Sequence, residues 1–410
     1  MISEETFKIW FEKELDILTS QICHYLNIDT SCGKEVESYN LLERILSNYG
    51  FVCNREEYNK NLIEHQYVTL PVQENGYNLR AKRITDNSYQ TVLFNCHVDV
   101  VPQVDDKLDL LTSVVKDGKI FGRGACDTKS NLFIVLGAIK LLDDLGIELG
   151  YNVLIDLVSD EETGGNGTLS TIMNGVESDL IVVLEPTDLE IYNGHRGCLT
   201  TTISVSGKSV HMGSDLTGIS AIKFSMRLIQ KLEALEACLI SDARTNPSFC
   251  FWEKPLQINI GKIKGGEWPG SVPEKCKIVF NTGFVPPDTI NDIERKIMNS
   301  INELLDEYPD VTLDYDFKSG LRNEAYISDI DLPLVYKFLN IKENGNPQKG
   351  AGMSRGWRVS CDARHYQKIA NIPTLIFGAG SLKHAHSKEE HIEINDIKKG
   401  IFIVANFLIN

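Results

Sequence analysis

Two residues near the end of one apolar run carry side chains that could bind a metal ion. His97 and Asp99 lie in the run 91–101, whose β-branched and aromatic residues predict a buried strand that ends before Pro102. Side chains two apart on a strand point to the same face, so we expect the Asp99 carboxylate within reach of the His97 imidazole. A metal-bound histidine usually donates its second ring N–H to such a carboxylate. A core histidine satisfied by a neighbouring aspartate explains the pair equally well.

Three further carboxylates follow predicted strands or loops in the first half of the chain. Asp127 stands between a glycine-rich loop and a helix start, where an aspartate commonly caps the helix. Glu161 and Glu162 follow a strand, and two neighbouring buried carboxylates repel each other unless a cation lies between them or one is protonated. A solvated loop pair is the ordinary alternative. Because adjacent side chains diverge, one glutamate could ligate a metal ion while the other holds a water molecule as general base.

One more glutamate and a histidine pair complete the set of candidate ligands. Glu185 ends another apolar strand, although a lone glutamate in that place is commonly a surface residue. His384 and His386 could bind a metal ion together, or one could be a ligand and the other exposed. Two histidines and three or four carboxylates without cysteine suit two zinc or similar ions bridged by a carboxylate. Such ions, roughly 3.5–4 Å apart, clamp a carbonyl group and activate water.

The elements that would position these residues alternate between strands and helices. Besides the run that contains His97, we expect strands near residues 51–53, 67–70, 153–158, 180–184 and 374–377. Helices are expected over residues 7–27, 39–49, 132–142 and 333–339 and from residue 394, with a hairpin at 116–119. Strands that alternate with helices and end in polar residues predict an α/β fold with a mixed central sheet flanked by helices, and ligands at the carboxyl ends of its strands.

A second domain is predicted inside the first. Residues 198–319 read as strands at 198–206, 256–263, 275–284 and 310–317 and helices at 218–239 and 288–305. This β-α-β-β-α-β order is the split βαβ arrangement of a ferredoxin-like α+β domain. A chain of 410 residues is longer than one hydrophobic core usually serves. We therefore expect a catalytic domain in two parts, 1–197 and 320–410, with the ferredoxin-like domain inserted at 198–319.

The composition excludes several classes of protein. The formal net charge is −16 and the pI is about 5.1, which argues against binding to nucleic acid or to an anionic membrane surface. The sequence has no apolar run long enough for a membrane span, and the first residues lack a secretion signal, so we expect a cytoplasmic protein. The ten cysteines contain no C-x-x-C pair, which indicates reduced structural thiols and excludes a cysteine zinc site.

Seven segments resemble, in order, the motifs of the dinuclear metallopeptidases, a family that includes acetylornithine deacetylase, succinyl-diaminopimelate desuccinylase, aminoacylase and the bacterial glutamate carboxypeptidases. The segments are N-C-H-V-D-V-V-P, G-R-G-A-C-D-T-K, S-D-E-E-T-G-G, L-E-P-T, S-G-K-S-V-H-M-G, S-C-D-A-R and G-A-G-S-L-K-H-A-H-S-K-E-E. The resemblance spans nearly the whole chain. It implies a zinc exopeptidase-like catalytic domain, with the inserted domain serving as a dimerisation domain and lid.

The resemblance also implies a ligand set for two divalent metal ions. One ion would be held by His97, Asp127 and Glu185, and the other by Asp127, Glu162 and His386. Zinc is the expected metal, with cobalt or manganese as alternatives.

Three further residues receive roles from the same resemblance. Glu161 would be the general base, and Asp99 would orient His97. In the family, the histidine that matches His211 lies on the inserted domain and stabilises the oxyanion in the partner subunit's active site, which requires a homodimer. Without the resemblance, His211 reads as a surface residue at the end of a strand.

The implied reaction is the hydrolysis of an amide bond in an N-acyl amino acid, as in acetylornithine deacetylase. Arg364, with Arg322 behind it, is our candidate for binding a substrate carboxylate, although a structural ion pair explains an arginine equally well. The strand at 276–284 lacks the D-x-R that several members carry, so their carboxylate contacts do not transfer. The rival activities are those of a dipeptidase or carboxypeptidase acting on short peptides. A non-catalytic metal-binding or regulatory homologue is the rival from another class.

Overall fold

The computed structural model describes residues 2–31, 33–73, 76–102, 111–343, 346–347 and 353–409. The chain divides into two compact units. The first comprises Met1–Gly194, Ser328–Arg355 and His365–Asn410, and the second His195–Ile327 and Gly356–Arg364. The insertion predicted at 198–319 is narrower than this second unit, which also takes in a segment after residue 355. The sequence also predicts a polar loop around residues 105–109 and a glycine-rich loop at 350–356, and the first loop and part of the second lie outside the described residues.

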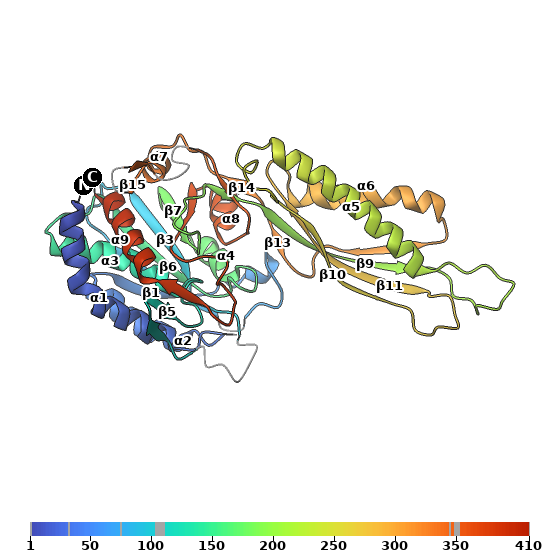
Figure 1. The fold of residues 1–410 in the computed structure, drawn as a ribbon, viewed down its shortest axis with the longest axis horizontal. Helices are drawn as coiled ribbons and strands as arrows, with labels where there is room; N and C mark the ends of the chain where they lie inside the picture. Colours follow the sequence, from blue (N-terminus) through green and yellow to red (C-terminus); the bar gives the residue numbers. More distant parts are fainter. Residues whose placement is uncertain are drawn as a thin grey trace. The chain divides into compact units, whose positions relative to one another are not determined.

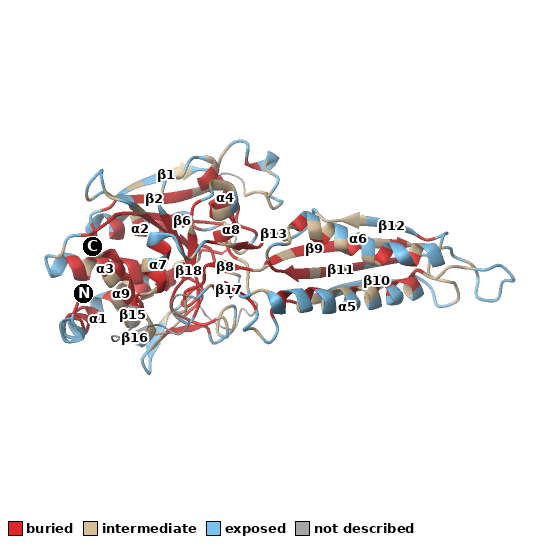
Figure 2. Ribbon diagram, turned by 90° about the horizontal axis from the view of Figure 1, so that it is seen from above, coloured by how far each residue is buried: buried red, intermediate tan, exposed pale blue. Residues whose placement is uncertain are grey.

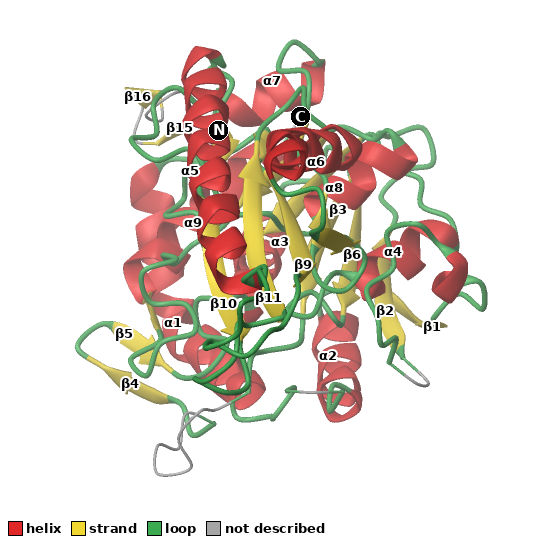
Figure 3. Ribbon diagram, turned by 90° about the vertical axis from the view of Figure 1, so that its right-hand side faces the viewer, coloured by secondary structure: helices red, strands yellow, loops and turns green. Residues whose placement is uncertain are grey.

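A six-stranded mixed sheet forms the centre of the first unit, with β3 in its interior (Figure 1). The spatial order is β1 (Val52–Glu57), β2 (Tyr77–Arg83), β6 (Asn152–Val158), β3 (Thr91–His97), β7 (Leu180–Leu184) and β18 (Thr374–Phe377). Strand β3 pairs in parallel with both β6 and β7, and β18 is parallel to β7. Strands β1 and β2 are antiparallel, and in Figure 3 the strands β3, β6, β2 and β1 follow one another in that order. The predicted mixed α/β sheet is confirmed.

Helices flank this sheet. They are α1 (Glu4–Leu26), α2 (Val36–Asn48), α3 (Leu132–Asp144), α4 (Asn166–Met173), α7 (Pro333–Leu339) and α9 (Ile394–Leu408), and the short α8 (Ala363–His365) lies where the chain returns from the second unit. The residues of α3 from Leu132 to Ile139 are all buried, which is the pattern of a helix inside a core. Strand β6 is buried along its whole length, whereas β1 at the edge is largely exposed (Figure 2).

The described residues of the first unit also form two small sheets and three single turns. Strands β4 (Val114–Lys116) and β5 (Lys119–Phe121) form the predicted hairpin, and β19 (His391–Glu393) pairs with β5. Strands β15 (Lys342–Glu343) and β16 (Asn346–Pro347) pair with each other. The turns are η1 (Leu62–Glu64), η2 (Lys129–Asn131) and η3 (Tyr366–Ala370). No described helix combines the length and the apolar character that a membrane crossing requires.

The strand predicted at residues 67–70 does not form. Leu70 is exposed, and Pro71, which follows it, has no N–H to donate to a strand ladder. The Asn166 side chain instead holds this segment as a loop: its Oδ1 accepts the Thr69 N–H at 3.0 Å, and its Nδ2 donates to the Thr69 carbonyl at 2.8 Å. The next strand, β2, begins later, at Tyr77.

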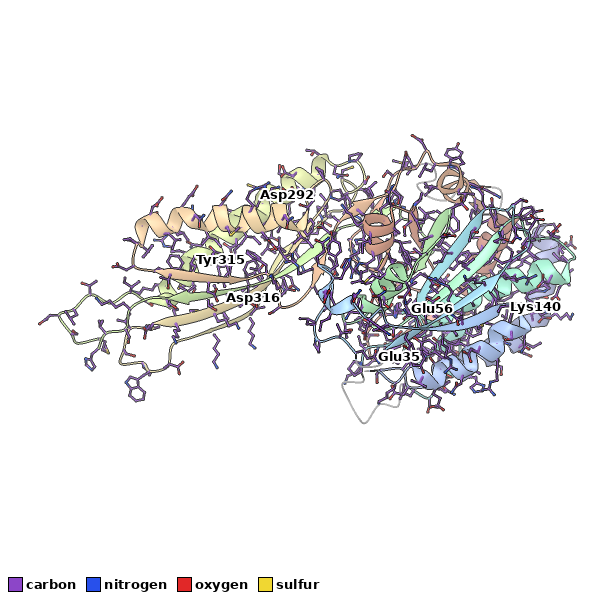
Figure 4. All side chains as sticks on the ribbon, turned by 180° about the vertical axis from the view of Figure 1, so that it is seen from behind. Glu35, Glu56, Lys140, Asp292, Tyr315 and Asp316 are labelled. Atoms are coloured by element: carbon purple, nitrogen blue, oxygen red, sulfur yellow. The ribbon has the colours of Figure 1, made fainter. Side chains whose placement is uncertain are left out.

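The second unit contains the predicted β-α-β-β-α-β order. Its antiparallel sheet has the spatial order β10 (Ile258–Gly265), β11 (Lys275–Phe284), β9 (Gly197–Ser206) and β12 (Thr312–Asp316), with β13 (Arg322–Asn323) also on β9. Helices α5 (Ala221–Thr245) and α6 (Ile290–Glu307) pack together on one face of it (Figure 1). Helix α6 begins after Thr289, which forms a capping box with Asp292 (labelled in Figure 4). A small sheet joins β14 (Tyr326–Ile327), β8 (Gly194–His195) and β17 (Gly356–Trp357).

Candidate metal centre

Two groups of side chains suited to metal ions share one aspartate in the first unit. His97, Asp127 and Glu185 form one group, and Asp127, Glu162 and His386 form the other. In each group the ligand atoms all lie within 4.8 Å of one another. These are the two sets that the family resemblance implies, so the structure brings the five predicted ligands together.

The sheet topology explains why residues so distant in sequence meet. His97 is the last residue of β3, Glu185 directly follows β7, and Glu162 follows β6 by a few residues. Because these three strands are neighbours and parallel, their carboxyl ends lie at one edge of the sheet. Asp127 comes from the turn before η2, and His386 from the loop before β19.

The two oxygens of Asp127 face different histidines. Its Oδ1 lies 3.2 Å from His97 Nε2, and its Oδ2 lies 3.2 Å from His386 Nε2. His386 Nε2 is also 2.9 Å from Glu162 Oε1. Two ligands of one tetrahedral zinc ion stand about 3.4 Å apart, given Zn–N and Zn–O bonds of roughly 2.1 Å. The donor types and these separations therefore fit two ions bridged by Asp127.

The charges of the site attract cations. Burial lowers the pKa of His97, but its hydrogen bond to Asp127 and the nearby negative charge of Asp99 outweigh burial and hold that pKa well above its ordinary value. Hydrogen bonds to Asp127 and Glu162 raise the pKa of His386 to about 10. Burial acts to raise the pKa of Asp127, but the hydrogen bonds to the two histidines keep it below its ordinary value. Protons on these histidines occupy the place that metal ions would take, so metal binding must release them.

His386 has a backbone conformation that few residues adopt. Its φ is +58°, in the left-handed region, which costs an L residue of this size of the order of 1 kcal/mol or more. Such strain persists where the surroundings enforce it and is common at functional sites. Its neighbour His384 belongs to neither ligand group and lies with its ring 4.2 Å from that of His391. Of the two histidines, only His386 faces the Asp127 carboxylate in the part of the chain that the structure describes.

The Asp99 side chain lies near His97, as predicted, and also has partners that the sequence did not predict. His97 Nδ1 lies 2.9 Å from the Asp99 backbone oxygen, whereas the carboxylate is 3.6 Å away. The carboxylate accepts the backbone N–H groups of Glu161 at 3.2 Å and Glu162 at 3.0 Å. Strand β3 ends at His97, so the two-residue alternation of a strand does not extend to Asp99. Asp99 thus contacts His97 mainly through its backbone, and its side chain fixes the two glutamates.

Glu161 lies beside this cluster. Its negative charge contributes to the raised pKa of His97, and it precedes the ligand candidate Glu162. The turn that follows contains Gly164 with a φ of +131°, and a Cβ atom there would lie 2.3 Å from Thr69 Oγ1. A side chain does not fit at this position, so the glycine lets the turn pass close to the loop before β2.

The three remaining site candidates lie in the second unit. His211 is exposed, and its Nδ1 accepts the Gly213 N–H at 3.1 Å. Arg322 forms an ion pair with Glu294 at 2.7 Å, as the structural alternative predicts. Arg364 is buried, donates to the Cys361 carbonyl oxygen at 2.6 Å and lies 3.7 Å from Asp362. A role of either arginine toward a substrate carboxylate stays a prediction.

Two contacts around the centre escaped the sequence analysis. The carboxylate of Glu390 contacts the backbone of Asp127, and the side chain of Asn131 binds both the N–H and the carbonyl of Ala379, at 2.7 and 3.1 Å. Glu390 belongs to the S-K-E-E motif, but a motif match alone does not tell which main-chain atoms a side chain reaches.

Comparison with known proteins agrees with this geometry. Residues 93–410 match the model of peptidase family M20/M25/M40. An N-formyl-4-amino-5-aminomethyl-2-methylpyrimidine deformylase of Bacillus subtilis is 28% identical over 356 residues, 80% of each chain. The acetylornithine deacetylase of Buchnera aphidicola is 25% identical over 329 residues, 78% of this chain and 80% of that protein.

Solved structures share the fold at low sequence identity. A tripeptidase from Staphylococcus aureus has a TM-score of 0.73 at 16% identity, covering 95% of this chain and 96% of that one. Human carnosine dipeptidase 1 has a TM-score of 0.67 at 17% identity, covering 98% of each chain. From the family match over most of its length, the chain belongs to peptidase family M20/M25/M40, and it is a hydrolase that acts on amide bonds.

Proposed function

We propose that this hydrolase binds two divalent metal ions, with zinc as the expected metal, and removes a small acyl group from an N-acyl amino acid, as acetylornithine deacetylases do. The observation that carries the proposal is the position of Asp127, whose two oxygens face His97 and His386 separately. The curated relatives support deacylation, because a deformylase and several acetylornithine deacetylases are among them.

The residues divide the chemistry between them. Metal ions bound at the two groups would polarise the substrate carbonyl and lower the pKa of the attacking water. Glu161 takes a proton from that water and then delivers it to the leaving amine. Asp99 holds the backbone of Glu161 and Glu162, so the base keeps its position relative to the neighbouring ligand.

We further propose a homodimer that works in the cytoplasm. His211 from the inserted domain of one subunit would stabilise the oxyanion in the active site of the other, as the family resemblance implies. Arg364, with Arg322 as the second candidate, would bind the substrate carboxylate. Each arginine has a partner inside the second unit, so this role requires that partner to be shared or exchanged.

A substrate panel tests the proposed reaction. Metal-loaded protein is incubated with N-formyl and N-acetyl amino acids, including N-acetylornithine, and with dipeptides of the same residues. We expect release of formate or acetate to be at least about tenfold faster, in kcat/KM, than cleavage of the matched dipeptide, a difference of about 1.4 kcal/mol. Cleavage of dipeptides without deacylation would instead establish the dipeptidase or carboxypeptidase alternative.

One relative favours a second candidate substrate. The Bacillus subtilis deformylase acts on an N-formyl aminomethylpyrimidine, and it shares 28% identity with this chain. The panel therefore includes an N-formyl aminomethylpyrimidine beside N-formyl amino acids. A non-catalytic homologue, the remaining alternative, predicts no turnover of any of these compounds, and the presence of Glu161 and all five ligand candidates speaks against it.

A further inference from the structure

A buried ion pair between Arg123 and Glu390 contacts the backbone of Asp127. Glu390 and Arg123 are 1% and 3% exposed, and Arg123 Nη1 donates to Glu390 Oε2 at 2.6 Å. The other carboxylate oxygen, Oε1, accepts the backbone N–H groups of Cys126 and Asp127, each at 3.3 Å. The two oxygens of Glu390 thus have separate partners, one cationic side chain and one stretch of main chain.

The surrounding elements hold Glu390 in this place. The Glu390 carbonyl oxygen accepts the Gly122 N–H at 3.1 Å. The next residue, His391, begins β19 and pairs with Phe121 of β5. The strand pair therefore fixes the Glu390 backbone next to the loop that carries Asp127.

We propose that Glu390 is a positioning residue for the metal centre: its Oε1 fixes the Asp127 backbone so that the two Asp127 carboxylate oxygens face His97 and His386. With its main chain held, Asp127 can vary only its side-chain torsions. Groups that hold metal ligands in this way typically contribute 10–100-fold to metal affinity or activity. The proposal rests on the proposed metal centre.

The chemistry of a glutamine at this position separates the two roles of Glu390. A Gln side chain has one acceptor oxygen and one NH2 group. In Glu390→Gln, an amide oxygen that faces the N–H groups of Cys126 and Asp127 turns the NH2 group toward the Arg123 guanidinium. The NH2 group and the guanidinium are both hydrogen-bond donors, so they do not pair. Replacing Arg123 by Met removes this donor–donor contact.

A pair of double variants provides the test. Arg123→Met/Glu390→Gln and Arg123→Met/Glu390→Met both lack the ion pair, but only the first retains an acceptor for the Asp127 N–H. Zinc affinity is measured by chelator competition, cobalt coordination by visible absorption, and folding by circular dichroism. We expect the Met/Met variant to bind zinc roughly 10–100-fold more weakly than the Met/Gln variant, to show an altered cobalt spectrum, and to lose kcat with KM little changed.

Equal zinc affinities and cobalt spectra in the two folded double variants would overturn the proposal, because the role of Glu390 would then be confined to stability. If the Met/Met variant does not fold, Glu390→Asp tests the proposal instead, because this variant keeps the charge but moves the acceptor oxygen away by one methylene group. A zinc affinity of Glu390→Asp equal to that of the wild-type chain would also overturn the proposal. Failure of the wild-type chain to bind zinc at all is a different result, and it would refute the proposed function itself.

Discussion

At the scale of single residues, the adjacent carboxylates have different proposed roles: Glu161 is the general base and Glu162 is a metal ligand. Glu162 Oε1 lies 2.9 Å from His386 within a ligand group, whereas Glu161 belongs to neither ligand group. We expect Glu161→Gln to lower kcat by roughly 10²–10⁴-fold while the bound metal stays unchanged, because a general base is lost and no ligand is removed. Glu162→Gln, the matched control, should lose metal. Steady-state kinetics and metal analysis measure both, and near-normal turnover of Glu161→Gln would refute the assignment.

The raised pKa of Glu35 predicts how the unfolding free energy depends on pH. Glu35 is buried at the start of α2 (Figure 4), and burial together with the negative charge of Asp99 raises its pKa from 4.5 to about 6. The folded chain therefore binds this proton more tightly than the unfolded chain does. The resulting stabilisation is complete below pH 4.5 and is lost as the pH rises through about 6, a change of about 2 kcal/mol.

Glu35→Gln should remove this contribution. Urea unfolding at pH 4.5 and pH 7 should give a smaller difference in unfolding free energy for the variant than for the wild-type chain. The same difference in both proteins would show that Glu35 does not carry this pH dependence.

Sequence motifs predicted the ligand candidates but not the residues behind them. His97, Asp127 and Glu185 stand at predicted strand ends or loop boundaries, so their side-chain types and positions could be judged together. The contact between Arg123 and Glu390 joins residues 267 positions apart, and it depends on the pairing of β19 with β5. The motif segments containing these two residues do not show that pairing. The contacts of the Asp99 carboxylate with the backbone of Glu161 and Glu162 join residues 62 and 63 positions apart, so no local pattern shows them.

At the scale of elements, α3 and α9 pack through glycines that face isoleucines. A Cβ atom on Gly137 of α3 would lie 2.6 Å from Ile401 Cδ1, and one on Gly400 of α9 would lie 2.7 Å from Ile134 Cδ1. Both isoleucines are completely buried, so their side chains have little room to move. The close approach of the two helices therefore depends on the missing side chains.

We predict that Gly137→Ala destabilises the fold by about 1–3 kcal/mol, the usual cost of an added methyl group in a packed core. Ala has a higher helix propensity than Gly, which by itself would stabilise the helix, so the expected loss of stability would come from packing. Gly261→Ala serves as the control, because its new methyl group would meet nothing closer than 3.8 Å. Thermal unfolding followed by circular dichroism compares the two, and an unchanged or higher Tm for Gly137→Ala would contradict the prediction.

Most elements were predictable because their apolar residues repeat with a helix or strand period. Helix α6 buries Ile290, Ile293, Ile297, Ile301 and Leu304 at spacings of three and four, which its sequence displays directly. The loop at residues 67–70 has the β-branched and aromatic residues typical of a strand, but the Asn166 side chain binds its backbone and holds it as a loop. That contact joins positions 97 residues apart and leaves no local signal.

At the scale of the whole molecule, the proposed oxyanion contact requires two subunits. His211 lies on the second unit and the ligand groups lie in the first. If His211 acts in the partner subunit, mixing the inactive variants Glu161→Gln and His211→Ala after subunit exchange should restore activity. We expect about one quarter of wild-type activity, because half of the dimers are hybrids and each hybrid has one complete site.

The mixture of variants distinguishes a His211 that acts in the partner subunit's active site from one that acts in the active site of its own subunit. Sedimentation first establishes whether the chain is dimeric and whether subunits exchange. Activity that stays at the level of the separate variants in exchanged dimers would place His211 in its own subunit's reaction or outside the reaction altogether.

The most direct test of the central claim is a count of the metal ions bound per chain. Protein stripped of metal is titrated with zinc and followed by calorimetry. We predict two zinc ions per wild-type chain, one in His97→Ala and in His386→Ala, and impaired binding of both in Asp127→Ala, because Asp127 alone belongs to both ligand groups. A single zinc ion per wild-type chain, or an Asp127→Ala variant that still binds two, would contradict the shared two-metal centre.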